Sequence, residues 1–223
     1  MVVTEMSNLQ HLLTPLNETL FVMGQDHVSS AELLGFATGV WCVWLTVRAK
    51  VANFPVGLAN DLFFFLLFFA ARLYADACLQ IIYFALGLAG WFTWIRGSDR
   101  APLPITKTRQ NEMVALLTAV FVGTVFLTWF LTGVHDGAPF LDALTTSLSL
   151  AAQWLLNFKK LQNWYFWIFA DLIYIPLYTS KHLWLTSLVY LVFLVLCLSG
   201  LRSWKSGAIA SRHELIPVET LLP

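Results

Sequence analysis

Long apolar stretches alternate with short polar segments along this chain. Seven apolar stretches can be delimited, at residues 31–48, 54–72, 74–95, 112–133, 139–157, 163–180 and 183–203. Each is close to the ~20 residues that a membrane-spanning helix needs. Residues 97–111 are polar and contain two prolines, which predicts a loop outside the membrane. The pattern therefore predicts an all-α integral membrane protein with seven transmembrane helices.

Composition supports a membrane protein and excludes several other classes. The chain is 58% hydrophobic and 12% charged, whereas a soluble domain usually has about 25% charged residues. It has no basic field for nucleic acid. Its three cysteines lie in apolar runs without metal-ligand spacing, so we expect no disulfide, no metal and no cofactor. Leucines recur at helical spacing between residues 9 and 20, which predicts an interfacial helix in the N-terminal segment 1–30.

Basic residues fall almost entirely on one side of the predicted membrane. With seven spans, only Arg72 and Lys181 lie on the side of the N-terminus, which leaves 11 of the 13 Lys and Arg residues on the other. Cytoplasmic loops carry an excess of Lys and Arg. We therefore expect the N-terminus outside and the C-terminus in the cytoplasm, ending in a short polar tail from Lys205.

The chain contains an internal repeat. Residues 32–97 align without a gap on residues 142–207, an offset of 110, with 14 identities in 66 positions. The matched residues include Trp44, Asn53, Asp61 and Trp94, which pair with a Trp, an Asn, an Asp and a Trp. Such matches are less frequent by chance than leucine matches. Each copy holds three spans, and the fourth span restores the side of the membrane, so the two copies have the same orientation.

The repeat predicts a division of the chain into five parts. Residues 1–30 form the N-terminal segment, 31–97 the first three-helix repeat, and 98–138 the cytoplasmic loop with a linker transmembrane helix. Residues 139–207 form the second repeat, and 208–223 the C-terminal tail. This is a 3+1+3 arrangement of two parallel repeats. Parallel repeats occur in secondary transporters that bind substrate near the midplane, between the repeats, so the repeat predicts transport.

Two carboxylates lie well inside apolar spans, Asp61 and Asp171, and they occupy the same repeat position. The other acids of these spans lie at helix starts, where the helix dipole favours negative charge; they are Glu32, Asp76, Glu112 and Asp142. A carboxylate at the bilayer centre costs about 2.5–3.5 kcal/mol on insertion scales. Each is therefore expected to face the interior of the helix bundle with a partner. The alternatives are a substrate contact and a structural hydrogen bond to a neighbouring helix.

Aromatic residues surround Asp171 more than Asp61. Trp167 and Tyr174 lie one helical turn to either side of Asp171, and Trp164 lies one turn further away. Aromatic faces beside a carboxylate suit a flat, positively charged ring. Tryptophans near basic loops, in contrast, are typical of an interfacial belt.

Three further positions, two polar and one a proline, are candidates for a role in substrate binding or in movement of the helices. Gln153 and Asn157 lie four residues apart, on one face of the fifth span, and their amides fit either sugar hydroxyls or contacts between helices. Pro176 removes one backbone hydrogen bond of the sixth span. It is either a hinge for alternating access or a fixed bend.

The sixth span also carries a family resemblance. The motif Asn163-Trp164-x-x-Trp167-x-x-x-Asp171, followed by IPLY, resembles the signature of PnuC-type nicotinamide riboside transporters. The segment at Gln153 and the GWFTW run at residues 90–94 add to the resemblance, which covers about residues 30–205. We include Trp91 and Trp94 of that run among the expected substrate-binding residues.

The resemblance implies a fold related to the SWEET sugar transporters and facilitated uptake of nicotinamide riboside, an NAD precursor of the vitamin B3 group, through a bacterial inner membrane. It further implies a homo-oligomer, such as a trimer, and a separate cytoplasmic kinase that traps the substrate. Carriers of thiamine, deoxynucleosides or sugars, with or without proton coupling, remain alternatives. An intramembrane enzyme or sensor would need a nucleophile–base pair or a metal cluster, and the sequence shows neither.

Overall fold

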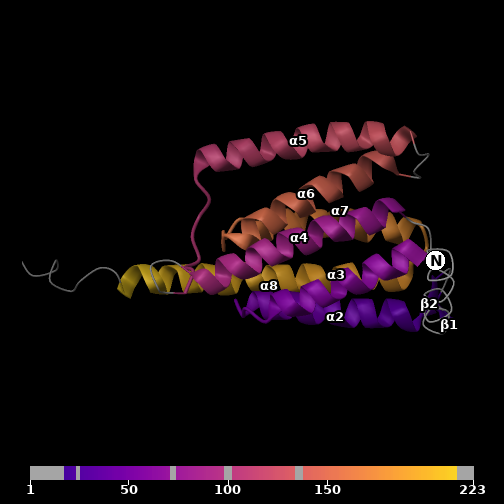
Figure 1. The fold of residues 1–223 in the computed structure, drawn as a ribbon, viewed down its shortest axis with the longest axis horizontal. Helices are drawn as coiled ribbons and strands as arrows, with labels where there is room; N and C mark the ends of the chain where they lie inside the picture. The colour runs from indigo at the N-terminus through magenta and orange to yellow at the C-terminus, as the bar shows by residue number, and fades with distance from the viewer. Residues whose placement is uncertain (1–17, 24–25, 71–73, 98–101, 134–137, 215–223) are drawn as a thin grey trace, which may run out of the picture.

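Seven helices occupy the seven predicted apolar stretches. The structure is a computed structural model, which describes residues 18–23, 26–70, 74–97, 102–133 and 138–214. Figure 1 shows the helices lying alongside one another in the long direction of the molecule. They are α2 (Ser30–Val47), α3 (Asn53–Ala70), α4 (Tyr74–Arg96), α5 (Gln110–Gly133), α6 (Pro139–Asn157), α7 (Asn163–Ser180) and α8 (Trp184–Glu214).

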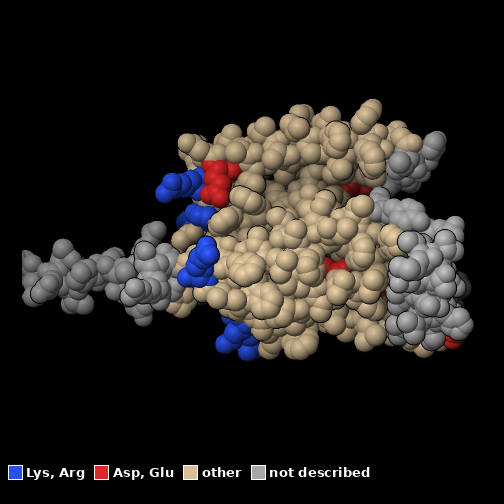
Figure 2. Space-filling view, in the orientation of Figure 1, with Lys and Arg blue, Asp and Glu red and all other residues tan. Residues whose placement is uncertain are grey.

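Four described helical segments are long and apolar enough to cross a membrane. They are Ser30–Val47, Asp76–Arg96, Gln110–Gly133 and Trp184–Ala208. Figure 2 shows a broad surface of uncharged residues, with the Lys and Arg side chains of this face gathered at the end where α5 begins. The chain is an integral membrane protein.

The ends of the described chain differ from expectation. The predicted interfacial helix lies mostly outside the described residues, but its last position, Leu20, is in β1 (Thr19–Met23). This strand pairs antiparallel with β2 (Asp26–Ser29). Thr, Phe and Val in the TLFVM segment favour extended backbone, which explains the strand. At the other end α8 continues to Glu214, so the tail predicted from Lys205 begins as helix.

Local sequence signals explain where the helices begin. Ser29 caps α2, because its Oγ accepts from the Glu32 backbone N–H at 3.2 Å while the Glu32 carboxylate accepts from the Ser29 N–H at 2.9 Å. This capping box satisfies two donors that a helix start leaves unpaired. Helix α6 begins at Pro139, a residue suited to the first helical turn.

The turn between α2 and α3 has the same geometry as the turn between α6 and α7. Ala49 and Lys159, 110 residues apart, both adopt the left-handed conformation, with φ of 51° and 47°. In each turn an asparagine side chain closes the loop: Asn53 Nδ2 donates to a lysine carbonyl at 2.7 Å and Asn163 Nδ2 at 2.6 Å. The asparagines identified in the repeat are therefore turn-forming residues.

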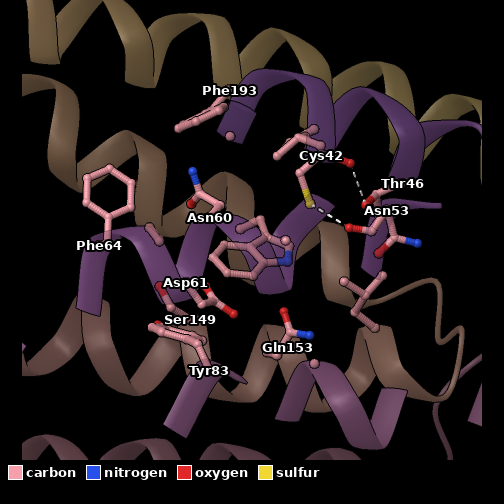
Figure 3. Close-up of a pocket in the computed structure, with 18 of the residues that line it drawn as sticks. Cys42, Thr46, Asn53, Asn60, Asp61, Phe64, Tyr83, Ser149, Gln153 and Phe193 are labelled. Atoms are coloured by element: carbon pink, nitrogen blue, oxygen red, sulfur yellow. Dashed lines mark hydrogen bonds between the residues drawn. The ribbon is translucent and has the colours of Figure 1, made fainter. Parts of the chain in front are cut away.

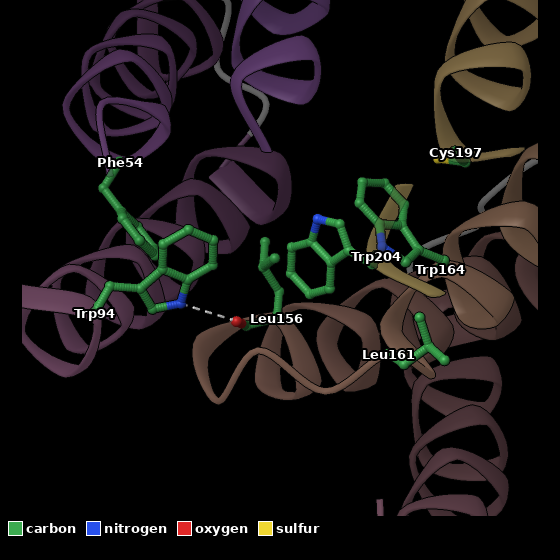
Figure 4. Packing of buried hydrophobic residues seen from close by; sticks show 7 residues of the cluster. All are labelled: Phe54, Trp94, Leu156, Leu161, Trp164, Cys197 and Trp204. Carbon is green, nitrogen blue, oxygen red and sulfur yellow. Dashed lines mark hydrogen bonds between the residues drawn. The ribbon is translucent and has the colours of Figure 1, made fainter. Parts of the chain in front are cut away.

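A cluster of seven buried residues, four of them aromatic, joins the two halves of the chain at the end where these turns lie. This aromatic cluster, seen in Figure 4, comprises Phe54, Trp94, Leu156, Leu161, Trp164, Cys197 and Trp204. Trp94 Nε1 donates to the Leu156 carbonyl at 3.1 Å, and Trp204 Nε1 donates to the Thr46 carbonyl at 3.2 Å. Each bond crosses from one half to the other, and each is the counterpart of the other at an offset of 110.

Helix α5 stands apart from the other six and lies along the outer side of α6 (Figure 1). A second cluster of buried residues holds it there, formed by Val120, Leu148, Ala151, Ala152, Leu155, Phe166 and Ala170. The outer face of α5 is apolar and exposed, with Phe121 70% and Trp129 73% exposed. The six remaining helices surround the candidate site.

Candidate substrate cavity

A cavity of about 410 Å³ lies among α2, α3, α4, α6, α7 and α8. Figure 3 shows part of its lining, with side chains from both halves of the chain converging on the same space. Small-molecule sites commonly have volumes of about 300–1,000 Å³ and are mostly apolar with a few polar groups. The cavity has the size expected of a small-molecule binding site between helices.

Six of the nine expected binding residues line this cavity. They are Asp61, Gln153, Trp164, Trp167, Asp171 and Tyr174. These six residues come from α3, α6 and α7 and are up to 113 positions apart in the sequence, from Asp61 to Tyr174. The fold brings them to one cavity. The structure gives each of them a distinct environment.

The other three residues lie outside the cavity lining and make structural contacts. Asn157 is 3% exposed and donates from Nδ2 to the Leu86 carbonyl at 2.8 Å. Trp94 is part of the aromatic cluster, and Trp91 packs against that cluster. Pro176 lies inside α7, which continues through it to Ser180, and is also absent from the lining.

Asp171 and Asp61 both reach the cavity but differ in burial. Asp171 is 4% exposed, and within the described chain its Oδ2 has no hydrogen-bond partner. The thiol of Cys197, from α8, lies next to the same carboxylate. Asp61 is more exposed to the cavity and lies close to Gly87 of α4. A buried carboxylate oxygen without a partner is costly, so Asp171 is prepared to accept a hydrogen bond from a ligand.

The two tryptophans of α7 have different roles in the cavity wall. Trp164 is 1% exposed and packs edge-on against Trp204, with ring centroids 5.4 Å apart. Gly200 leaves the space for its indole, because a Cβ there would collide with the Trp164 ring. Trp167 is half-buried and packs against both hydrophobic clusters. Its ring is therefore held between the clusters while part of it faces the cavity.

Tyrosines line the end of the cavity away from the aromatic cluster. The Tyr174 ring packs at a tilt against Tyr190 of α8 with ring centroids 4.4 Å apart and stacks on Tyr178 at 5.6 Å. Its hydroxyl lies near Thr145 of α6. In the first half, Tyr83 of α4 lies near Ser149 of α6. These contacts tie α6 to both α4 and α7 next to the cavity.

The cavity lining lacks positive charge. None of the described lining residues is Lys, Arg or His, whereas two are Asp. Lys159 lies against the aromatic cluster, with its Nζ 4.2 Å from the Trp94 ring centroid, and is outside the cavity lining. Burial lowers the pKa of the Lys159 ammonium. The cavity therefore suits a ligand that is cationic or rich in hydrogen-bond donors.

Several lining residues escaped the sequence reasoning, among them Asn60, Tyr83, Ser149 and Tyr190. Each is a polar residue inside an apolar stretch, which is the signal that could have identified them. They were missed because their partners at the offset of 110 are Ala170, Phe193, Gly39 and Gln80, so the repeat did not mark them. Residues that differ between the copies turn out to form much of the cavity.

Known proteins similar to this chain are membrane transporters. A family model described as "Nicotinamide mononucleotide transporter" matches residues 29–206. The "Nicotinamide riboside transporter PnuC" of Escherichia coli is 28% identical over 214 residues, which cover 83% of this chain and 89% of that protein. The "Riboflavin/roseoflavin transporter RibM" of Streptomyces davaonensis is 26% identical over 208 residues, which cover 91% and 96%.

A solved structure shares the fold. It is described as "Crystal structure of the Vitamin B3 transporter PnuC", and it superimposes with a TM-score of 0.66 at 18% sequence identity. The match covers 93% of this chain and 90% of that one.

Proposed function

This chain belongs to the nicotinamide mononucleotide transporter family, and we propose on that premise that it carries nicotinamide riboside through the bacterial inner membrane by facilitated diffusion. The proposal takes its substrate from the curated relatives described as nicotinamide riboside transporters. It assigns the substrate to the cavity between α2–α4 and α6–α8.

The chemistry of the cavity lining is the observation that carries the proposal. Nicotinamide riboside has a pyridinium ring with a fixed positive charge and a ribose with several hydroxyl groups. Aromatic faces attract a cationic ring, and carboxylates favour it further. The lining offers Trp167, Tyr174, Asp61 and Asp171, without a Lys, Arg or His among its described residues.

We assign roles within the cavity accordingly. Trp167 and Tyr174 contact the ring, Asp171 and Asp61 provide negative charge, and Gln153 bonds a hydroxyl or amide group of the ligand. Trp164 closes the cavity on the side of the aromatic cluster. Three expected residues act behind the wall instead of touching the ligand: Asn157, Trp91 and Trp94.

The architecture that we propose is the 3+1+3 arrangement. Helices α2–α4 and α6–α8 are then two parallel repeats, and α5 is the linker. The equivalent turns at Ala49 and Lys159 and the equivalent indole–carbonyl bonds of Trp94 and Trp204 support it. In this arrangement Pro176 is a hinge of α7, because a proline inside a helix removes one backbone hydrogen bond. The counterpart in α3 is Leu66.

The orientation and the partners are also proposals. The end with most Lys and Arg side chains (Figure 2) faces the cytoplasm, so that the C-terminus is inside and the N-terminus outside. The exposed apolar face of α5 contacts membrane lipid or a second copy in a homo-oligomer such as a trimer. A separate cytoplasmic kinase traps the carried substrate.

Calorimetric titration of the purified protein tests the substrate. We expect heat of binding with nicotinamide riboside and none with thiamine or riboflavin at the same concentrations. Binding of riboflavin alone would instead align the chain with its riboflavin-transporting relative. Uptake into proteoliposomes with and without a proton gradient tests facilitated diffusion, and an uptake that requires the gradient would contradict it.

A further inference from the structure

Two side-chain amides in the cavity wall are held in fixed orientations, and each belongs to only one half of the chain. Asn60 of α3 corresponds to Ala170 of α7, and Gln153 of α6 corresponds to Val43 of α2. Both line the cavity, and Figure 3 shows them on different sides of it. Neither amide group therefore has a counterpart in the other half of the chain.

Thr38 and the backbone fix the amide of Asn60. Its Nδ2 donates to the Gly35 carbonyl at 3.1 Å and to Thr38 Oγ1 at 2.6 Å. A carbonyl can only accept, and the single hydroxyl proton of Thr38 is used on the Leu34 and Gly35 carbonyls, at 2.7 and 3.1 Å. The amide cannot rotate by 180° without losing both bonds. Asn60 therefore presents its carbonyl oxygen as the free group.

Asn157 fixes the orientation of the Gln153 amide, also through hydrogen bonds. Asn157 Nδ2 donates to the Leu86 carbonyl, which can only accept, so its Oδ1 points the other way. Gln153 Nε2 donates to that Oδ1 at 3.1 Å. The Gln153 carbonyl oxygen is thereby turned away from Asn157. The chain of bonds from Leu86 through Asn157 ends in an oriented acceptor on the cavity wall.

We propose that these two oriented amides, from Asn60 and Gln153, make the cavity selective for the neutral carboxamide of nicotinamide riboside over the carboxylate of its acid analogue, nicotinic acid riboside. A carboxamide has two N–H donors that can bond amide oxygens, whereas a carboxylate has only acceptors and would face these oxygens unpaired. The carboxylates of Asp61 and Asp171 add repulsion. This inference rests on the proposed function. It identifies Thr38 and Asn157 as positioning residues that act through the amides.

Binding of both ligands to the purified protein tests the proposal. We expect wild-type protein to bind nicotinamide riboside at least about tenfold more tightly than nicotinic acid riboside, because a polar site that loses its donors leaves buried groups unpaired. Thr38→Val removes the shorter of the two hydrogen bonds that hold the Asn60 amide and leaves the bond to the Gly35 carbonyl at 3.1 Å, and Asn157→Leu frees Gln153. In each variant the loosened amide can turn its NH₂ group to the carboxylate, so the preference should fall by roughly threefold or more.

The control is Thr118→Val on α5, where the hydroxyl bonds only to the Val114 carbonyl at 3.0 Å among the described contacts. It should leave both affinities unchanged. A purely structural role would make Thr38→Val and Asn157→Leu weaken both ligands by the same factor, and an unchanged ratio would overturn the proposal. Equal wild-type affinity for the two ligands would also overturn it, while transport stands. If wild-type protein binds neither ligand, the proposed function itself fails.

Discussion

The halves α2–α4 and α6–α8 share their supporting contacts and differ in what they show to the cavity. In the first half Phe54 packs edge-on against Trp94 with centroids 5.0 Å apart, and in the second Trp164 packs against Trp204 at 5.4 Å, both at 85°. At the cavity wall, by contrast, Gly57 stands where the second half has Trp167. The supporting contacts at the turns and in the aromatic cluster, which we call the frame, are equivalent in the two halves, whereas the cavity lining differs between them.

The difference shows how a symmetric frame can hold an asymmetric ligand. The asparagine-closed turns and the indole–carbonyl bonds occur in both halves, so these supporting contacts are equivalent on the two sides of the cavity. The ligand, with a ring at one end and a sugar at the other, needs different partners at each end. The substitutions Phe64/Tyr174 and Val43/Gln153 supply those partners while leaving the turns and the aromatic cluster unchanged.

The sharpest test of this comparison is the pair of aspartates. Asp171→Asn should weaken binding of nicotinamide riboside by roughly ten- to a hundredfold, because a hydrogen bond to a charged group contributes about 1.5–3 kcal/mol. Asp61→Asn should cost less than about tenfold, since Asp61 is less buried than Asp171. Calorimetric titration of both variants measures the difference. Equal losses would mean that the two halves contribute equally to binding.

The indole–carbonyl bonds of Trp94 and Trp204 test whether the supporting contacts are equivalent in the two halves. Trp94→Phe and Trp204→Phe each remove one indole donor and part of a buried ring, which together should cost about 2 kcal/mol of stability. The Leu156 and Thr46 carbonyls keep the backbone N–H groups of Lys159 and Ala49 as donors. Because the two bonds are equivalent, the melting temperatures of the two variants should fall by the same amount. A clear difference between them would show that one half supports the bundle more than the other.

Trp167 tests the contribution of the cavity lining that only the second half provides. Trp167→Ala removes the aromatic face next to the cavity and should weaken binding about tenfold, in line with a partly desolvated cation–π contact. Trp154→Ala is the matched control: its side chain is 45% exposed and packs on Phe158 away from the cavity. Calorimetric titration should show near wild-type affinity for Trp154→Ala. Similar losses in both variants would argue against a direct contact of Trp167.

The helices could be predicted because two signals, the apolar stretches and the internal repeat, can be read from a single sequence. Apolar stretches of about 20 residues mark helices whatever they pack against, and an offset of 110 brought out Asp61 and Asp171 as a pair. Trp167 and Tyr174, which the sequence predicted as substrate contacts, line the cavity, because residues one turn away from a cavity-facing carboxylate share its helix face.

Tertiary packing decided what the sequence missed. Trp94 and Asn157 were expected at the ligand, but each bonds a backbone carbonyl of another helix, and helical spacing cannot reveal such a partner. Asn60 was not expected, since only its bond to Thr38 across α2 and α3 shows how its amide is turned. The short hairpin before α2 was missed because leucine periodicity outweighed the β-branched residues of β1.

The smallest expected effect concerns a contact that breaks the symmetry outside the cavity. The segment before α5 lies against the α6–α7 turn: Leu161 N–H donates to the Thr106 carbonyl at 2.8 Å, and Thr108 N–H donates to Gln162 Oε1 at 2.8 Å. The position equivalent to Gln162 in the first half is Ala52. This segment therefore binds the turn of the second half and stiffens that end of the frame alone.

Gln162→Ala should remove the side-chain part of this contact and lower stability by about 0.5–1 kcal/mol, the usual net value of such hydrogen bonds. The affinity for nicotinamide riboside should stay the same, because Gln162 is absent from the cavity lining. Gln110→Ala, at the exposed first residue of α5, is the control and should leave the melting temperature unchanged. If Gln162→Ala alters uptake at unchanged affinity, the segment controls the movement of the second half, and the two halves differ in dynamics as well as in lining.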